Sequence, residues 1–442
     1  MNITGKKEKR QPWSFIPTQY FAEGVPFVIV NNLSVIMYKS LGVANDLIGY
    51  TSFLYLPWSL KFLWAPFVDS AASKRSWVVW MQFLLAICFA TTALGIQLNS
   101  FFTFTLIIFT ITAFVSATHD IVTDGFYLHA LNKGDQAFFT GIRSTFYRFA
   151  MIFAGGILVT FAGSLSMGSN MKHGWSLALL AASALFAIFW LYHKFILPYP
   201  SSDVPVSPGG SLTSFREVFR EYFTQSRIGI ILTYILLYRF GEGLLLKMAA
   251  PFLLDSPDKG GLGIGVAQVG IMYGTVGIIA LIIGGILGGW MIKKYGLKRL
   301  IWIMALAMNL PNLLYVYLSI TKPISNIQLD LSFISGKFGG GAWLFEINPI
   351  AQLCIFVEQF GYGFGFTAFI VYLLYISKGQ YKTSHYAIST GLMAIGMMVP
   401  GFISGWFQVH YGYQTLFWTS FLTTIPGMAV IPFLPVEKDN NS

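Results

Sequence analysis

Apolar runs recur along nearly the whole chain, and at about 20 residues or more each is long enough to cross a bilayer as an α-helix. Only 10% of the 442 residues are charged, against about 25% in a soluble domain, so polar surface is too scarce to cover a soluble globule. The sequence predicts an all-α membrane protein with twelve spans. Their predicted limits are 14–38, 47–68, 76–97, 101–130, 137–166, 174–196, 228–254, 264–292, 299–319, 347–377, 383–409 and 413–435.

Lys and Arg residues are concentrated in alternate loops between these spans. With a cytoplasmic N-terminus, 18 of the 28 lie on the cytoplasmic side, five on the outer side and five within spans, as the positive-inside rule requires. We therefore expect a multi-pass protein of the cell inner (plasma) membrane with both termini in the cytoplasm. The basic residues form no stripe, which argues against a nucleic-acid partner. We expect the lipid bilayer and a small-molecule substrate as partners, and a monomer.

The chain divides near its middle. Residues 197–227 are polar and rich in Pro, Ser and Gly, which is typical of a flexible cytoplasmic linker. Within it, residues 215–223 predict a short amphipathic helix lying on the membrane. The linker separates a predicted N-terminal six-helix bundle, residues 1–196, from a C-terminal six-helix bundle, residues 228–442.

Short motifs recur at matching helices of the two halves. They are FAEG at 21–24 with FGEG at 240–243, LIG at 47–49 with QVG at 268–270, and His119-Asp120 with Glu358-Gln359. Three correspondences in order predict two homologous halves related by an axis along the membrane normal, with solute bound between them near mid-membrane. This pattern indicates a transporter, because a passive channel would not explain it.

Ten charged residues fall inside the predicted spans, where each costs about 2.5–3.5 kcal/mol at a helix centre. The acids are Glu23, Asp120, Asp124, Glu242 and Glu358, and the bases are Lys61, Arg143, Arg148, Arg239 and Lys247. Two interpretations stay open. The charges are ion pairs that hold helices in place, or some acids titrate during transport while some bases bind an anionic solute.

Spacing places some of these charges together. Asp120 and Asp124 are four residues apart and Arg239 and Glu242 are three apart, so each pair shares a helical face. A carboxyl that alternates between an apolar setting and a nearby cation takes up and releases a proton. We therefore expect proton coupling at the five acids.

The bases are candidates for binding the substrate. Lys61 and Arg148 lie at similar predicted depths and are candidate partners of the two aspartates. Arg239 and Gln359 are further candidates in the second half. Lys247 lies further out on the seventh helix, where it attracts an anion or extends its amine toward the interface.

Signals for an enzyme or a metal are weak. His119, Asp120 and Asp124 on one helix resemble a metal cluster, but no further ligands stand at set spacing. No nucleophile elbow, phosphate-binding glycine loop or zinc motif occurs in a suitable context. We expect no enzyme activity, metal or cofactor, and we expect Cys88 and Cys354 to be buried packing residues.

Several segments resemble the AmpG-like permeases of the major facilitator superfamily, a family that includes bacterial muropeptide permeases, the acetyl-CoA transporter of the endoplasmic reticulum and single-subunit siderophore importers. The matching segments are LPWSLKFLWAPFVD at 56–69, SATHDIVTD at 116–124, Tyr147-Arg148, LYRFGE at 237–242, and FVEQ at 356–359 followed by Gly361 and Gly363. The resemblance implies a major facilitator fold and proton-driven import of an anhydromuropeptide. Import of a siderophore or of a bulky anion such as an acyl-CoA is the alternative.

The resemblance also implies gating residues. The superfamily carries an acidic and glycine-rich loop after the second helix of each half. Asp69 keeps the acid in the first half, without the Arg that usually follows. In the second half Gly289 and Gly296 match, while Lys293 stands where the acid belongs. A conformational latch made by the acid is therefore expected only in the N-terminal half.

Overall fold

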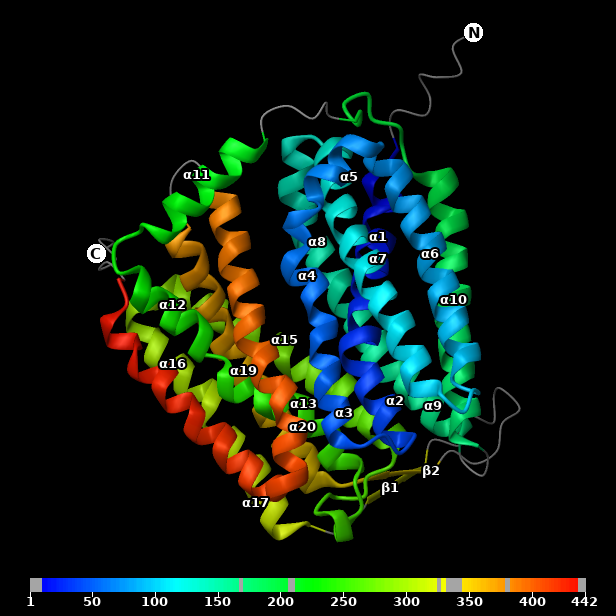
Figure 1. The fold of residues 1–442 in the computed structure, drawn as a ribbon, viewed down its shortest axis with the longest axis vertical. Helices are drawn as coiled ribbons and strands as arrows, with labels where there is room; N and C mark the ends of the chain where they lie inside the picture. Colours follow the sequence, from blue (N-terminus) through cyan, green and yellow to red (C-terminus); the bar gives the residue numbers. More distant parts are fainter. Residues whose placement is uncertain are drawn as a thin grey trace. The chain divides into compact units, whose positions relative to one another are not determined.

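A computed structural model of the chain describes residues 10–166, 170–205, 211–323, 327–330, 344–377 and 382–435. It is helical along most of these ranges (Figure 1). The α-helices of the first half are α1 (Ile16–Val28), α2 (Ser34–Ser40), α3 (Asn45–Tyr50), α4 (Leu56–Leu60), α5 (Ala65–Ala71), α6 (Lys74–Gly95), α7 (Phe101–Ala130), α8 (Lys133–Ile152), α9 (Leu158–Leu165) and α10 (Met171–Ile196).

Those of the second half are α11 (Ser211–Phe223), α12 (Ile228–Leu237), α13 (Phe240–Leu254), α14 (Val266–Val269), α15 (Ile278–Tyr295), α16 (Leu297–Asn309), α17 (Asn312–Thr321), α19 (Pro349–Ile376) and α20 (Lys382–Ala429). Short 3₁₀ and π-helical turns connect or extend them: η1 (Pro12–Ser14), η2 (Ile29–Leu33), η3 (Thr51–Tyr55), η4 (Lys61–Leu63), η5 (Phe153–Ile157), η6 (Pro257–Lys259), η7 (Gly270–Gly277) and η9 (Ile431–Phe433).

Ten helical stretches within the described ranges are long and apolar enough to cross a membrane. Two features reconcile them with the twelve predicted spans. The second span, 47–68, consists of the short pieces α3, η3, α4, η4 and α5, because Pro57 and Pro66 cannot donate a helical N–H bond. The eleventh and twelfth spans are continuous in α20, where Gly412 takes a left-handed φ of 77° between them. The architecture is therefore consistent with twelve spans.

Large apolar side chains are exposed on the long helices. Trp80 of α6, Ile107 of α7 and Phe195 of α10 are each more than half exposed, at 60%, 56% and 70%. Apolar surface of this extent does not face water in a soluble monomer. It is the surface that helices present to lipid, where apolar side chains cost nothing to expose.

The first compact unit comprises Met1–Leu41, Phe53–Ser226 and Gly379–Ile395. In it α6 packs against both α7 and α10, and α1 packs against both α8 and α7. Phe15, Val122 and Phe126 are fully buried members of an apolar cluster in this unit. Both α1 and α4 pack on α7. The charged residues of this half lie on α1, α7, α8 and the turn η4 that follows α4.

The second compact unit comprises Gly42–Ser52, Arg227–Lys378 and Gly396–Ser442. Its centre is α19, which packs against both α15 and α16. Gly363 faces the backbone of Leu281 in α15, and Gly361 and Gly365 face the backbone of α16 at Ala307 and Met304. Small residues let membrane helices approach closely, which gives the glycines of the tenth-helix motif a packing role.

The helix pairings of one half recur in the other. In the first unit α1 packs on α8, α5 on α7 and α6 on α7. The equivalent pairs in the second unit are α13 with α20, α15 with α19 and α16 with α19. Gly24 abuts Ala150 and Gly243 abuts Met397, so the glycine after each motif glutamate makes the same helix contact. The predicted correspondence of the halves is thus present in the packing.

The segment 42–52 is anchored within the second unit by a buried polar cluster. The Asn45 side-chain amide donates to Gln408 Oε1 at 2.6 Å and to the Tyr413 hydroxyl at 2.9 Å. Tyr413 in turn donates to Asp255 Oδ2 at 2.6 Å. Gly405 lies against the Asn45 backbone, so this short helix can approach α20 closely.

The predicted amphipathic helix of the linker is present as α11. Its apolar side chains Val218 and Tyr222 are buried, and the Tyr222 hydroxyl lies 2.8 Å from Ser389 Oγ. Arg216 and Arg220 are exposed on its other face. Tyr222 thus packs on the first part of α20, whereas Phe223 is exposed. That the helix lies on the membrane stays a prediction.

The outer segment 320–346 had no interpretation from sequence. Its described ends carry two short strands, β1 (Ile327–Asp330) and β2 (Leu344–Ile347). They pair antiparallel, with Ile327 opposite Ile347 and Asp330 opposite Leu344. This small sheet is the one departure from an all-helical chain among the described residues.

Replacing Gly363 with Ala tests the packing of α19. An added Cβ would overlap the Leu281 carbonyl of α15, whereas at Gly289 of α15 nothing lies within 4 Å of an added Cβ. Both changes gain about 1 kcal/mol of helix propensity. We expect Gly363→Ala to lower the thermal unfolding temperature of purified protein in detergent and Gly289→Ala to leave it unchanged or raise it. Equal effects would contradict close packing at Gly363.

Candidate functional site

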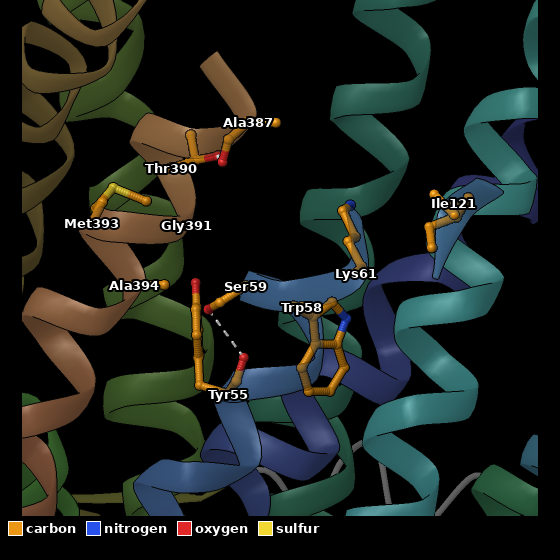
Figure 2. A pocket seen from close by; sticks show the side chains of 11 residues that line it. Tyr55, Trp58, Ser59, Lys61, Ile121, Ala387, Thr390, Gly391, Met393 and Ala394 are labelled. Carbon is orange, nitrogen blue, oxygen red and sulfur yellow. Dashed lines mark hydrogen bonds between the residues drawn. The ribbon is translucent and has the colours of Figure 1, made fainter. Parts of the chain in front are cut away.

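A cavity of about 320 Å³ opens within the first unit (Figure 2). Its lining residues come from the second and fourth spans and from the first part of α20: Tyr55, Trp58, Ser59, Lys61, Ala65, Ile121, Ala387, Thr390, Gly391, Met393 and Ala394. Figure 2 shows the α20 residues on the side opposite Tyr55, Trp58 and Lys61. The wall thus combines aromatic rings, three hydroxyl groups and one cation.

The aromatic part of this wall is held by α1. The Phe27 ring meets the Tyr55 ring edge-on at 5.6 Å and the Trp58 ring edge-on at 5.1 Å. Such edge-to-face contacts fix the orientation of aromatic rings. Because Pro57 breaks regular helix between them, the two rings can both reach the same cavity.

The cation of the wall is ion-paired. Lys61 Nζ donates to Asp120 Oδ2, and Asp120 is also hydrogen-bonded to Glu23 of α1. Two carboxylates cannot donate to each other, so a hydrogen bond between them requires a proton. The second oxygen of Glu23, Oε2, is buried without a partner, which also fits the neutral acid. Glu23, Lys61 and Asp120 thus form one cluster of two acids and a cation.

Asp124 has a different partner from the one expected. Arg143 of α8 lies 3.2 Å from Asp124 Oδ1, and the Tyr20 hydroxyl donates to the same oxygen at 2.9 Å. Arg143 also donates to the Tyr20 hydroxyl at 3.1 Å. Of the two expected partners of the aspartates, Lys61 is confirmed and Arg148 is wrong, because the side chain of Arg143 reaches this face of α7 instead.

In the second unit, Arg239 and Glu242 form a bidentate pair. Arg239 donates to the two Glu242 oxygens at 2.9 and 2.7 Å, and to the Tyr362 hydroxyl at 2.8 Å. Both charged side chains are almost fully buried, at 4% and 6% exposure. This geometry satisfies the charge of each partner, as buried ions require.

Glu358 lies in the same unit without a cation. Its Oε2 accepts from the side chain of Gln359 at 2.9 Å, and Gln359 also donates to the Tyr273 hydroxyl at 3.1 Å. Tyr273 is carried by the π-helical turn η7, a distortion common at functional sites. No ion pair among the described residues involves Glu358, which is 3% exposed.

Two of the predicted bases have no acidic partner. Arg148 of α8 and Lys247 of α13 are each half-buried, and neither enters an ion pair with a described residue. A cation in a membrane helix is costly unless it reaches water, an anion or the interface. Both remain candidates for contact with an anionic solute.

The predicted gating residues are placed only in part. Asp69 belongs to α5 by its backbone, and its side chain is outside the described part of the structure. Gly289 lies within α15, and Gly296 ends that helix with a positive φ of 79°. A positive φ favours glycine, so Gly296 sets the turn into α16.

His119 does not join the aspartates as a metal ligand. Its Nε2 lies 3.1 Å from Gln82 Nε2, and Gln82 Oε1 lies 2.8 Å from His193 Nδ1. Thr18 of α1 ends this buried chain, 2.8 Å from His193 Nε2. The described residues contain no cluster of three or more potential metal ligands. This hydrogen-bond network instead links the four helices α1, α6, α7 and α10.

Sequence reasoning missed the tyrosines and the aromatic wall. Tyr20 lies three residues before Glu23, and Tyr362 lies four after Glu358, so each shares a helical face with a flagged acid. That spacing was available in the sequence. The signal for Tyr55 and Trp58 was weaker, because Pro57 breaks the helical periodicity that would have placed them on one face.

Comparison with known proteins identifies the family. Residues 19–355 match the family model of the Major Facilitator Superfamily. The chain is 24% identical over 419 residues to the anhydromuropeptide permease of Escherichia coli strain K12, covering 93% of this chain and 77% of the relative. It is 26% identical over 431 residues to putative transporter AmpG 1 of Rickettsia felis, covering 88% of this chain and 90% of the relative.

Solved structures agree on the fold. A D-xylose-proton symporter aligns with a TM-score of 0.68 at 11% identity, covering 96% of this chain and 97% of that chain. A mutant form of the nucleoside transporter NupG aligns with a TM-score of 0.67 at 15% identity, covering 95% of this chain and 98% of that chain. At such low sequence identities, these structures support the fold of the chain and nothing about its function.

The matched model covers most of the chain, and both the relatives and the fold are those of transporters rather than enzymes. The protein is therefore a multi-pass secondary transporter that acts on a small molecule in a membrane. It belongs to the Major Facilitator Superfamily, as an AmpG-like permease.

Proposed function

We propose that the protein imports an anhydromuropeptide across the bacterial inner membrane together with protons, as a monomer with cytoplasmic termini. The observation that carries the proposal is the cluster of Glu23, Lys61 and Asp120 at the wall of the cavity. A carboxyl pair that holds a proton beside a solute cavity is what a proton symporter needs.

The charge balance of Glu23, Lys61 and Asp120 favours a bound proton. Lys61 and Asp120 neutralise each other, and Glu23 is neutral while it shares its proton with Asp120. Removing that proton would leave two carboxylates facing one cation in a largely buried setting, which like-charge repulsion and desolvation oppose. Opening the site to the cytoplasm supplies water for the charged form. The same carboxyls therefore hold a proton in one state and release it in the other.

The lining of the cavity and the names of the relatives both favour a muropeptide as the solute. Aromatic faces at Tyr55 and Trp58, hydroxyls at Ser59 and Thr390, and the cation of Lys61 suit a solute with sugar rings and carboxylates. An anhydromuropeptide has both. The Escherichia coli relative is named for transport of this compound class.

We assign different roles to the charged residues of the second unit. Glu358 has no cation and is the candidate second proton carrier, with Gln359 as its polar partner. Arg239 and Glu242 neutralise each other fully, so we propose that this pair positions helices. We also propose gating roles for Asp69, Gly289 and Gly296, and a C-terminal bundle that begins after the linker 197–227.

Replacing Glu23 with Gln tests the proton site. Proteoliposomes take up labelled anhydromuropeptide, and we expect acid outside to accelerate uptake and a protonophore to cancel the effect. Gln imitates the protonated acid, so Glu23→Gln should lose gradient-driven accumulation, by about tenfold or more, yet keep exchange of labelled for unlabelled solute.

The control is Asp258→Asn, at an exposed loop acid, which should leave both activities intact. Gradient-driven accumulation by Glu23→Gln at the wild-type rate would contradict the proton site. Uptake of a ferric siderophore with none of the anhydromuropeptide would contradict the proposed substrate.

A second test separates pairing from proton transport at Glu242. Arg239→Gln alone leaves a buried carboxylate without its cation, which costs about 3–5 kcal/mol, so we expect poor stability in detergent. The double variant Arg239→Gln with Glu242→Gln leaves neither charge, and should recover both thermal stability and gradient-driven uptake. Recovered stability without gradient-driven uptake would show that Glu242 carries a proton.

A further inference from the structure

Lys61 is hydrogen-bonded to an acid and also lines the cavity. Its ammonium donates to Asp120, yet 37% of its side chain is exposed and it lines the cavity beside Trp58. An ammonium carries three N–H donors, so capacity remains for a second acceptor. In Figure 2 Lys61 stands on the same wall as Tyr55 and Trp58. Among the described residues Asp120 is the acid that Lys61 meets at ion-pair distance, and Glu23 and Asp124 lie further away.

We propose that Lys61 binds a carboxylate of the solute and that this carboxylate displaces Asp120, which takes up a proton as the solute binds. The inference rests on the proposed function and deepens it, because it makes solute charge and proton uptake one event. Lys61 would then decide both that the solute must be anionic and that it cannot bind without a proton.

The charged and titratable groups around Asp120 determine whether the exchange keeps the site electrically neutral. Lys61 faces it from η4, Glu23 from α1 and Tyr147 from α8. On its own helix it is flanked by His119 and by Asp124, whose charge Arg143 neutralises. With Glu23 protonated, the empty site has no net charge.

A carboxylate that enters this site adds one negative charge to a setting that disfavours it. Neutrality returns when a hydronium ion of the aqueous phase gives a proton to the Asp120 oxygen that Lys61 has released. One O–H bond of the hydronium breaks, leaving water, and one O–H bond forms on Asp120. No other covalent bond in the protein or the solute changes. The protein therefore takes up about one proton for each solute carboxylate that binds to Lys61.

The rest of the cavity indicates what the carboxylate is attached to. At about 320 Å³ the cavity is at the small end of ligand pockets, which span about 300–1,000 Å³. It holds one ring with its carboxylate rather than a whole muropeptide. The rings of Tyr55 and Trp58 offer apolar faces, and the small residues Ala387, Gly391 and Ala394 leave room opposite. The bound part is an acidic, ring-bearing end of the solute.

Calorimetry on the full-length protein in lipid nanodiscs tests the exchange. The probes are an anhydromuropeptide with free carboxylates and the same compound as its methyl ester, each titrated in buffers of different ionisation enthalpy to count protons. Wild type should take up about one proton with the acid and none with the ester. Asp120→Asn, which imitates the protonated acid, should bind the acid without proton uptake.

Variants of Lys61 identify the anion site. Lys61→Arg keeps the cation and should keep the preference for acid over ester. Lys61→Met combined with Asp120→Asn leaves neither charge unpaired, so it should fold and bind the ester, but lose the preference for the acid by roughly tenfold. Lys172→Gln, at an exposed lysine that contacts Leu98 and Phe101, is the control and should match wild type.

The outcomes separate this inference from the function on which it rests. Equal binding of acid and ester to wild type without proton uptake would overturn the inference alone, as would an intact acid preference in the double variant. Binding of neither compound would overturn the proposed substrate and the inference together.

Discussion

The cost of charge in hydrocarbon governs this structure. Each ionised side chain in a span must find an opposite charge, a proton or water. Helix packing brings several of the charged side chains next to a partner of opposite charge. Lys61 meets Asp120, Arg143 meets Asp124 and Arg239 meets Glu242. Glu23 lies beside Asp120 and Lys61, and Glu358 accepts an amide hydrogen bond. The same requirement makes these residues responsive, because any change in water or solute changes the balance.

The two units meet this requirement in different ways. In the second unit, Arg239 and Glu242 bind each other with two hydrogen bonds and are buried, so the pair is closed to solute. In the first unit, Lys61 is tied to Asp120 and still open to the cavity. Buried pairs of the first kind hold helices, whereas an open pair can exchange partners. The ion pair that accompanies the repeated motif is thus buried in the second unit and open to a cavity in the first.

Irregular backbone helps to place the exchangeable site. Pro57 and Pro66 divide the second span into short helical pieces, which brings Tyr55, Trp58 and Lys61 to one cavity wall. Phe27 holds the two rings from α1, one turn beyond Glu23. The first and second spans thus carry both the aromatic wall and two members of the charged cluster, Glu23 and Lys61, so a movement of either span would affect both.

Sequence alone determined the class of protein and the identity of the charged residues, and it predicted the spans and the correspondence of the halves, because the bilayer imposes strict limits on length, polarity and charge. It also paired Arg239 with Glu242, since residues three apart share a helical face. Only the tertiary structure decided that Arg143 rather than Arg148 meets Asp124, that Tyr20 bonds to Asp124 and Tyr362 to Arg239, that α11 packs on α20, and that Lys61 faces a cavity. Those outcomes depend on which faces of separate helices meet, and local periodicity does not encode contacts between residues a hundred positions apart.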